Sequence, residues 1–84
     1  MTKHVKLAVV ERKLGREKAA GLYWPEKALA EVDPNQPPKE YLDTVVHEVL
    51  HHAMQSLSER RINSVSRTIS RTLWKMGYRK VVGA

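Results

Sequence analysis

The sequence contains no cysteine among its 84 residues. This absence excludes a disulfide framework, and it also excludes a zinc site built from thiolates. A chain of this length forms one domain and buries only about 60–65% of its unfolded surface, so its hydrophobic core is small. We therefore expect a source of stability in addition to the core.

Long hydrophobic runs are also missing. No stretch approaches the roughly 18 apolar residues needed to span a bilayer, and the first ten residues are too interrupted by charge for a secretory signal. We therefore expect a cytoplasmic protein with no membrane partner. Acidic residues are few, since nine Asp and Glu stand against 15 Lys and Arg, a net charge of +6. This excess weakly suggests nucleic acid or an acidic partner, because the charge is spread along the chain.

Three short segments have the pattern of β-strands. Val5, Leu7 and Val9 alternate with less apolar neighbours, which predicts a first strand over residues 4–10. A charged segment over 11–18, either a turn or an extended hairpin tip, leads to a second strand over 19–24, and a third strand is predicted over 28–32. Pro25 suits a type I turn between the last two. Residues 26–32 also have good helix propensity, so a helical turn is the alternative there.

Two helices are predicted after the strands. The first, over residues 38–55, begins at Pro38, and the second, over 59–76, ends before Gly77 as a left-handed cap. The short turn between them makes them antiparallel neighbours. The seam that packs on the first helix is predicted at three- and four-residue steps, namely Ile62, Val65, Ile69, Leu73 and Met76. The sequence thus predicts one α+β domain over residues 1–84, a short three-stranded sheet followed by an antiparallel helical hairpin.

The first helix carries an H-E-x-x-H motif, His47-Glu48-Val49-Leu50-His51. Histidines four positions apart lie on one face of a helix, where two neutral ring nitrogens can share one zinc ion. Glu48 can then act as general base toward a water molecule in metal-assisted hydrolysis. Shuffling this composition produces the motif in about one chain in a hundred. The alternative is a surface helix that carries histidines without a metal.

A catalytic zinc site needs a third protein ligand, which we predict to be Glu59 at the start of the second helix. Ser56 and Glu59 could instead form a capping box, whereas a cap at Ser58 would leave Glu59 free to face the metal. His52 points about 100° round the helix from His51 and is expected outside the site. Asn63 is either a hydrogen-bond partner of a ligand histidine or a solvated surface residue.

Three segments together resemble the small predicted metallopeptidases of phage and prophage genomes. They are the H-E-x-x-H helix, Ser58-Glu59 after a tight turn, and Leu73-Trp74-Lys75-Met76-Gly77-Tyr78-Arg79. These proteins look like minimal zincins, more distantly similar to ImmA/IrrE-type peptidases, and the likeness covers roughly residues 15–79. It implies zinc bound by His47 and His51 with Glu59 as the acidic ligand, and Glu48 as catalytic base. It also implies that the strand at 28–32 pairs with an extended peptide substrate.

The expected function is therefore zinc-dependent hydrolysis of peptide bonds in a protein or peptide substrate. A first alternative is a non-catalytic interaction module that zinc stabilises. A second is nucleic-acid binding through the second helix, although the residues for base stacking are absent there; its basic residues are Arg60, Arg61, Arg67 and Arg71. For stabilising an oxyanion, no candidate is favoured among Tyr23, Tyr41, His4 and His52.

Overall fold

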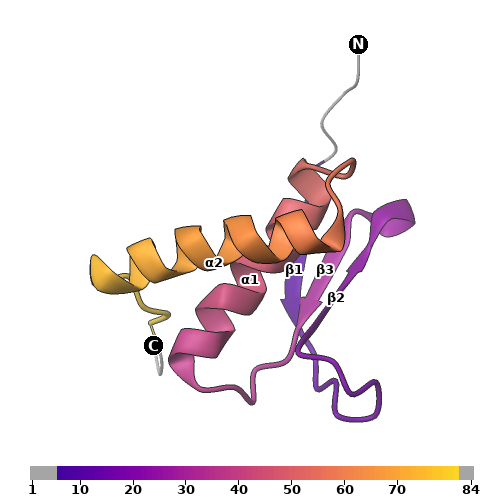
Figure 1. Ribbon diagram of the computed structural model, residues 1–84. Helices are drawn as coiled ribbons and strands as arrows, with labels where there is room; N and C mark the ends of the chain where they lie inside the picture. Colours follow the sequence, from indigo (N-terminus) through magenta and orange to yellow (C-terminus); the bar gives the residue numbers. More distant parts are fainter. Residues whose placement is uncertain (1–5, 82–84) are drawn as a thin grey trace.

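A computed structural model describes residues 6–81 and has an α+β fold, a three-stranded mixed sheet followed by two helices (Figure 1). The elements are β1 (Ala8–Glu11), β2 (Gly21–Trp24), a 3-10 turn η1 (Pro25–Lys27), β3 (Leu29–Val32), α1 (Pro38–Ala53) and α2 (Glu59–Lys75). The predicted fold class and the order of elements are confirmed. The first strand was predicted over residues 4–10, of which 4 and 5 lie outside the described residues. The observed strand begins later, at Ala8, and ends at Glu11.

β3 is the central strand of the sheet. It pairs in parallel with β1 and antiparallel with β2, which gives the order β1-β3-β2. A tight connection joins β2 to β3, because Pro25 begins η1 and Ala28 closes it in the left-handed region, at φ 46° and ψ 49°. The backbone N–H of Ala28 donates to the carbonyl of Pro25 at 3.2 Å. The helical alternative for residues 26–32 is thus confined to this single turn.

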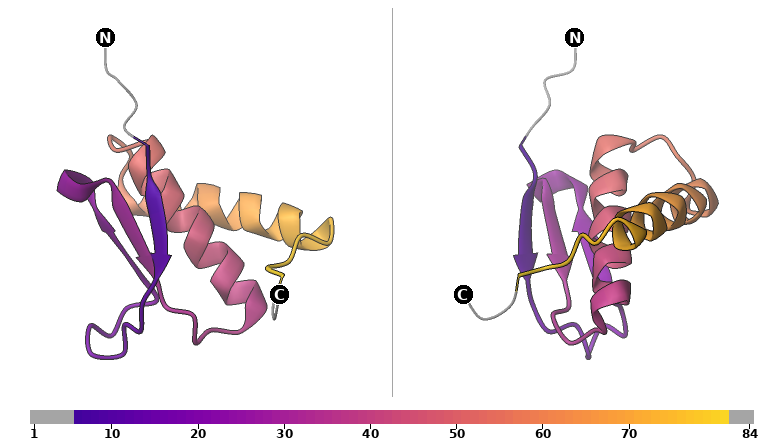
Figure 2. Two further views of the ribbon diagram at one scale, coloured as in Figure 1. Left: turned by 180° about the vertical axis from the view of Figure 1, so that it is seen from behind. Right: turned by 90° about the vertical axis from the view of Figure 1, so that its left-hand side faces the viewer.

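Both helices lie on the same side of the sheet (Figure 2). Helix α1 packs on β2 and β3, and α2 packs on α1. Ala30 and Val32 face this side and are fully buried. The alternate residue, Glu31, points to the other face of the sheet, where Arg12 donates to its carboxylate at 2.7 and 3.0 Å and Trp24 Nε1 donates at 2.8 Å. The hydrogen bonds from Arg12 and then Trp24 hold the pKa of Glu31 below its ordinary value.

Helix α2 contacts α1 through part of the predicted apolar seam and through small side chains. Ile62 is fully buried as expected, and the next buried positions along this face are Ser66 and Ser70. The hydroxyl of Ser70 donates to Asp43 of α1 at 2.7 Å. The predicted seam is thus met at Ile62 and at Leu73, which is half-buried and borders a hollow with Leu42 and Val45 of α1. Serines take the most buried positions between these two residues. Ile69 and Met76, which were also predicted to belong to the seam, are exposed.

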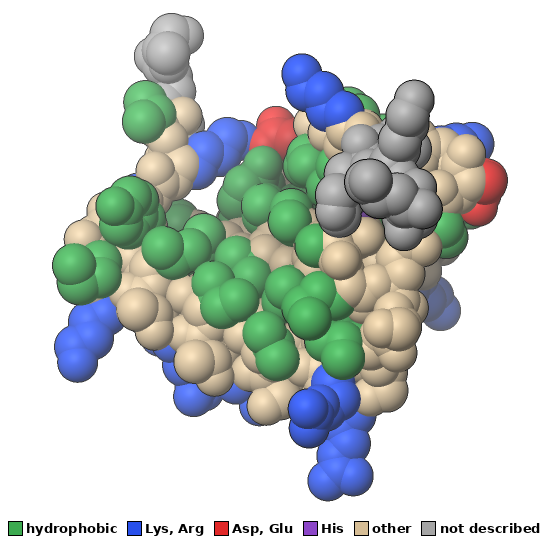
Figure 3. Space-filling model, turned by 90° about the horizontal axis from the view of Figure 1, so that it is seen from above, with side chains coloured by type: hydrophobic (Ala, Val, Ile, Leu, Met, Phe, Trp, Pro, Cys, Tyr) green, Lys and Arg blue, Asp and Glu red, His purple; other side chains and the backbone are tan. Residues whose placement is uncertain are grey.

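Among residues 6–81, few large side chains are fully buried, and many hydrophobic ones remain on the surface. The buried hydrophobic residues are Leu14, Ala28, Ala30, Val32 and Ile62. Figure 3, which looks down on the molecule of Figure 1, shows hydrophobic side chains gathered over the middle of that face. Within residues 6–81, neither helix has the length and apolar character that a membrane span requires.

Candidate metal centre

The H-E-x-x-H motif lies in the last two turns of α1, where a helical backbone fixes the relative position of its histidines. His47 and His51 are partly buried and stand one turn apart. Their Nε2 atoms are 3.1 Å from each other, and their ring centroids are 4.8 Å apart. Both rings thus direct the same nitrogen toward one point beside the helix.

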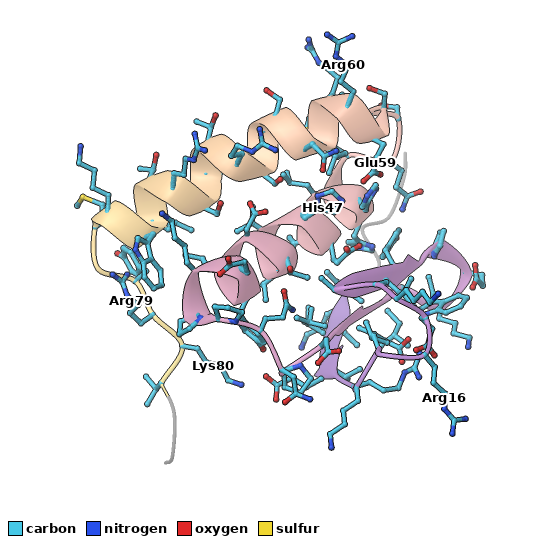
Figure 4. All side chains as sticks on the ribbon, turned by 60° about the horizontal axis from the view of Figure 1, so that its bottom comes forward. Arg16, His47, Glu59, Arg60, Arg79 and Lys80 are labelled. Carbon is cyan, nitrogen blue, oxygen red and sulfur yellow. The ribbon has the colours of Figure 1, made fainter. Side chains whose placement is uncertain are left out.

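Glu59 reaches that point from α2. The side chain of Ser58 caps this helix by accepting the backbone N–H of Arg61 at 3.2 Å, so Glu59 is the first helical residue. Its Oε1 lies 2.8 Å from His47 Nε2, and its Oε2 lies 2.9 Å from His51 Nε2. Figure 4 shows Glu59 and His47 pointing toward each other across the gap between the helices. The helix is therefore capped by Ser58, and the alternative capping box between Ser56 and Glu59 is not formed.

The three side chains form a group that could hold a metal ion. One ligand atom from each of His47, His51 and Glu59 can be chosen so that all lie within 4.8 Å of one another. Ligands of a tetrahedral zinc ion at about 2.0–2.1 Å stand about 3.3 Å apart, close to the separations seen here. Two imidazoles and one carboxylate are also the ligand set of a catalytic zinc site. The residues present therefore fit this ion.

Glu48 lies beside these ligands and is almost completely buried, with 7% of its surface exposed. Burial raises the pKa of its carboxyl group; nearby His47 acts in the opposite direction, and the charge of Glu59 raises the pKa further. The side chain lies against the backbone of β2 at Gly21. A Cβ atom at Gly21 would stand 2.7 Å from Thr44 Cγ2 and 2.8 Å from Glu48 Oε2. Only glycine allows the strand to approach the helix this closely.

Tyr23 of β2 forms one wall of the centre and was only one of four candidates in the sequence. Its ring is nearly parallel to that of His51, with an interplanar angle of 6° and centroids 6.3 Å apart. Its hydroxyl lies 2.8 Å from His52 Nδ1 and accepts the side-chain N–H of Gln55 at 3.1 Å. His52 is thus held at the rim by Tyr23. The sequence signal for this wall was Gly21, since a glycine within a strand often marks a close approach.

Asn63 does not join the centre. No hydrogen bond links its side chain to His47 or His51 within the described part of the chain. Asn63 is exposed and lines a groove on the outer side of α2 together with Arg60 and Arg67. The predicted contact with a ligand histidine is therefore not made, and Asn63 is the solvated surface residue of the alternative.

A shallow cleft opens over the candidate ligands, and its other wall is β2. The residues lining it are Gly21, Leu22, Tyr23, Pro25, His47, Glu48, His51 and Glu59. The strand expected to offer a free edge, at residues 28–32, is instead the central strand, with β1 and β2 on its two sides. That expectation is wrong, and the sheet edge beside the cleft is β2.

Comparison with protein-family models, curated proteins and solved structures gives no match to this chain.

Proposed function

We propose that this protein is a zinc-dependent hydrolase of peptide bonds. The observation that carries the proposal is the convergence of His47, His51 and Glu59 beside the buried carboxylate of Glu48, all lining one cleft. The three ligands would hold zinc, which when bound polarises a carbonyl group and makes water more acidic. The H-E-x-x-H motif, with its glutamate next to the first ligand, is the arrangement that this chemistry uses.

Glu48 carries the proton in this proposal. Its carboxylate accepts a proton from the attacking water and passes it to the leaving amine. Burial suits it to this exchange, because a raised pKa brings a carboxyl group closer to the pH at which it both accepts and donates protons. Tyr23 brings a hydroxyl group to the opposite wall of the cleft, and its ring is stacked on that of His51.

The substrate in this proposal is an extended peptide lying along β2. Strands at the edge of a sheet bind extended peptides through main-chain hydrogen bonds. Residues Gly21–Tyr23 border the cleft that holds the candidate ligands, so a peptide paired there would pass over them. We retain the cytoplasm as the expected compartment.

The test is the metal content of protein purified without added metal. We expect about one zinc ion per chain in the wild type and in His52→Ala. We expect its loss in His51→Ala, because His51 belongs to the ligand group and His52 does not. Equal zinc in the two variants would overturn the site. Zinc together with hydrolysis of a peptide library supports the enzyme. Zinc with no turnover on that library would favour the non-catalytic, metal-stabilised module instead.

A further inference from the structure

The outer side of α2 carries a row of arginines that the candidate metal centre does not use. Helix α2 has five basic residues and one acidic residue, Glu59, so it carries four of the six net positive charges of the chain. Glu59 points toward His47, whereas the adjacent Arg60 projects away from the helix pair (Figure 4). The acidic residue thus belongs to one side of α2 and the arginines belong to another.

The side chains on that outer side line a shallow groove, which we call the basic groove. Its residues are Arg60, Asn63, Ser64, Arg67, Thr68 and Arg71. All are exposed, and the groove contains no acidic and no hydrophobic side chain. Within residues 6–81 no ion pair involves any of its three arginines. Three arginines therefore line one side of the helix without an ion pair to any carboxylate of the described residues.

We propose that the basic groove binds the phosphate backbone of nucleic acid without reading its sequence. Arg60 and Arg71 are separated by about 16 Å along the helix axis, at about 1.5 Å per residue. On one strand of duplex DNA, that length spans roughly five phosphates. Arginines suit these oxygens, and hydroxyl and amide side chains such as Ser64 and Asn63 also make phosphate contacts. Aromatic residues for stacking on bases are absent from the groove, which excludes base readout of that kind.

Two neighbouring features set the limits of this site. A second hollow adjoins the groove at Arg67 and Arg71, and it contains Glu40 and Asp43 of α1. These carboxylates repel a polyanion, so phosphates would approach Arg67 and Arg71 from the groove and not from this hollow. An anionic membrane fits less well, because helices that lie on membranes insert apolar side chains beside their basic ones. The groove has none.

The experiment measures binding of the full chain to a fluorescein-labelled DNA duplex of mixed sequence by anisotropy, between about 50 and about 200 mM NaCl. Three phosphate contacts predict a slope of log K against log salt of about −2.7. The paired substitution Arg67→Gln with Arg71→Gln should reduce the slope to about −0.9 and weaken binding at least about tenfold in the lowest salt. Arg67→Lys with Arg71→Lys should preserve the slope.

The matched control removes the same charge elsewhere. Lys13 and Arg16 are exposed in the β1–β2 connection, and Arg16 lies far from Arg60 (Figure 4). Lys13→Gln with Arg16→Gln should leave the slope unchanged and the affinity within about twofold. The zinc content of the Arg67→Gln and Arg71→Gln protein should equal that of the wild type, so this result is independent of the proposed hydrolase.

Three outcomes would overturn the proposal. The first is a wild-type Kd weaker than about 100 μM for the duplex at about 50 mM salt. The second is an equal loss in the groove pair and in the control pair, which would assign binding to net charge alone. The third is tighter binding to labelled polyglutamate, or to phosphatidylglycerol vesicles, than to the duplex. Far-UV circular dichroism of each variant verifies that α2 remains folded.

Discussion

In the proposed hydrolase, Glu48 is the residue whose substitution separates metal binding from catalysis. It is buried beside His47 and Glu59 but does not belong to the ligand group. Glutamine has nearly the same shape and cannot accept a proton. We expect Glu48→Gln to retain zinc and to lower the rate of peptide hydrolysis by about 10²–10⁴-fold, the usual contribution of a general base.

The matched control for this substitution is Glu40→Gln, an exposed acid in the first turn of the same helix. It should leave zinc content and hydrolysis unchanged. The measurement is kcat/KM on a cleaved peptide, with zinc content determined on the same samples. Unimpaired hydrolysis by zinc-loaded Glu48→Gln would contradict the role given to Glu48.

Glu31 gives a pH-dependent prediction on the other face of the sheet. The hydrogen bonds from Arg12 and Trp24 lower its pKa in the folded state from the ordinary 4.5. This carboxylate therefore stabilises the fold above about pH 4.5, and the contribution is lost as the pH falls through the lower folded value. Glu31→Gln should lower the Tm by about a few degrees at pH 7, and the difference from wild type should shrink in acid.

Thermal unfolding followed by circular dichroism across this pH range measures the effect. Glu26→Gln is the comparison, since Glu26 is exposed on the neighbouring turn η1. A Tm difference for Glu31→Gln that stays constant from neutral pH into acid would show that the ion pair is not its source.

At the scale of elements, the contact between β2 and α1 depends on Gly21. A methyl group there would overlap Thr44 and Glu48, at 2.7 and 2.8 Å. We expect Gly21→Ala to destabilise the protein by about 1–3 kcal/mol, the usual cost of overpacking, and to reduce hydrolysis by displacing Glu48. In Gly15→Ala the new methyl group meets nothing within 4 Å. Urea denaturation should therefore show a lower midpoint only for Gly21→Ala.

The elements that the sequence predicts well are those that local interactions define. The spacing of His47 and His51 is fixed by the helix that contains them. Gly77 was predicted as a left-handed cap because glycine adopts this conformation readily, and its φ is 92°. The hydrogen bonds from Gly77 to Trp74 and from Tyr78 to Leu73 complete that cap. Glu59 could be proposed as a ligand for the same reason, because a short turn brings it beside His51.

Features set by packing between distant segments were not predictable. Leu14 lies in a charged stretch expected to be a surface turn, yet it is fully buried, and its backbone N–H donates to Asp33 at 2.9 Å. The buried side of α2 holds Ser66 and Ser70, although a hydrophobic pattern favours Ile69. The sequence contains no local signal for the central position of β3 either. Each of these depends on which surfaces meet, and periodicity reports only which surfaces are apolar.

For the whole molecule, the small core means that the proposed zinc ion would contribute a large share of the stability. Zinc at a hundred times its Kd would add about 2.7 kcal/mol to the free energy of unfolding. For a domain of this size, that corresponds to a rise in Tm of about 10–20 °C. We expect EDTA to reverse the rise, and His47→Ala to have no zinc-dependent rise at all. An equal shift in His47→Ala, measured by calorimetry, would assign the stabilisation to another site.

The central position of β3 has a consequence for the order in which the chain folds. β2 and β3 are joined by a single turn, so this hairpin closes early and at low entropic cost. β1 has no partner until β3 is in place, and its register, Ala8 opposite Leu29, closes a much longer loop. Substitutions in β1 should therefore accelerate unfolding and leave the refolding rate almost unchanged, whereas those in the hairpin should slow refolding.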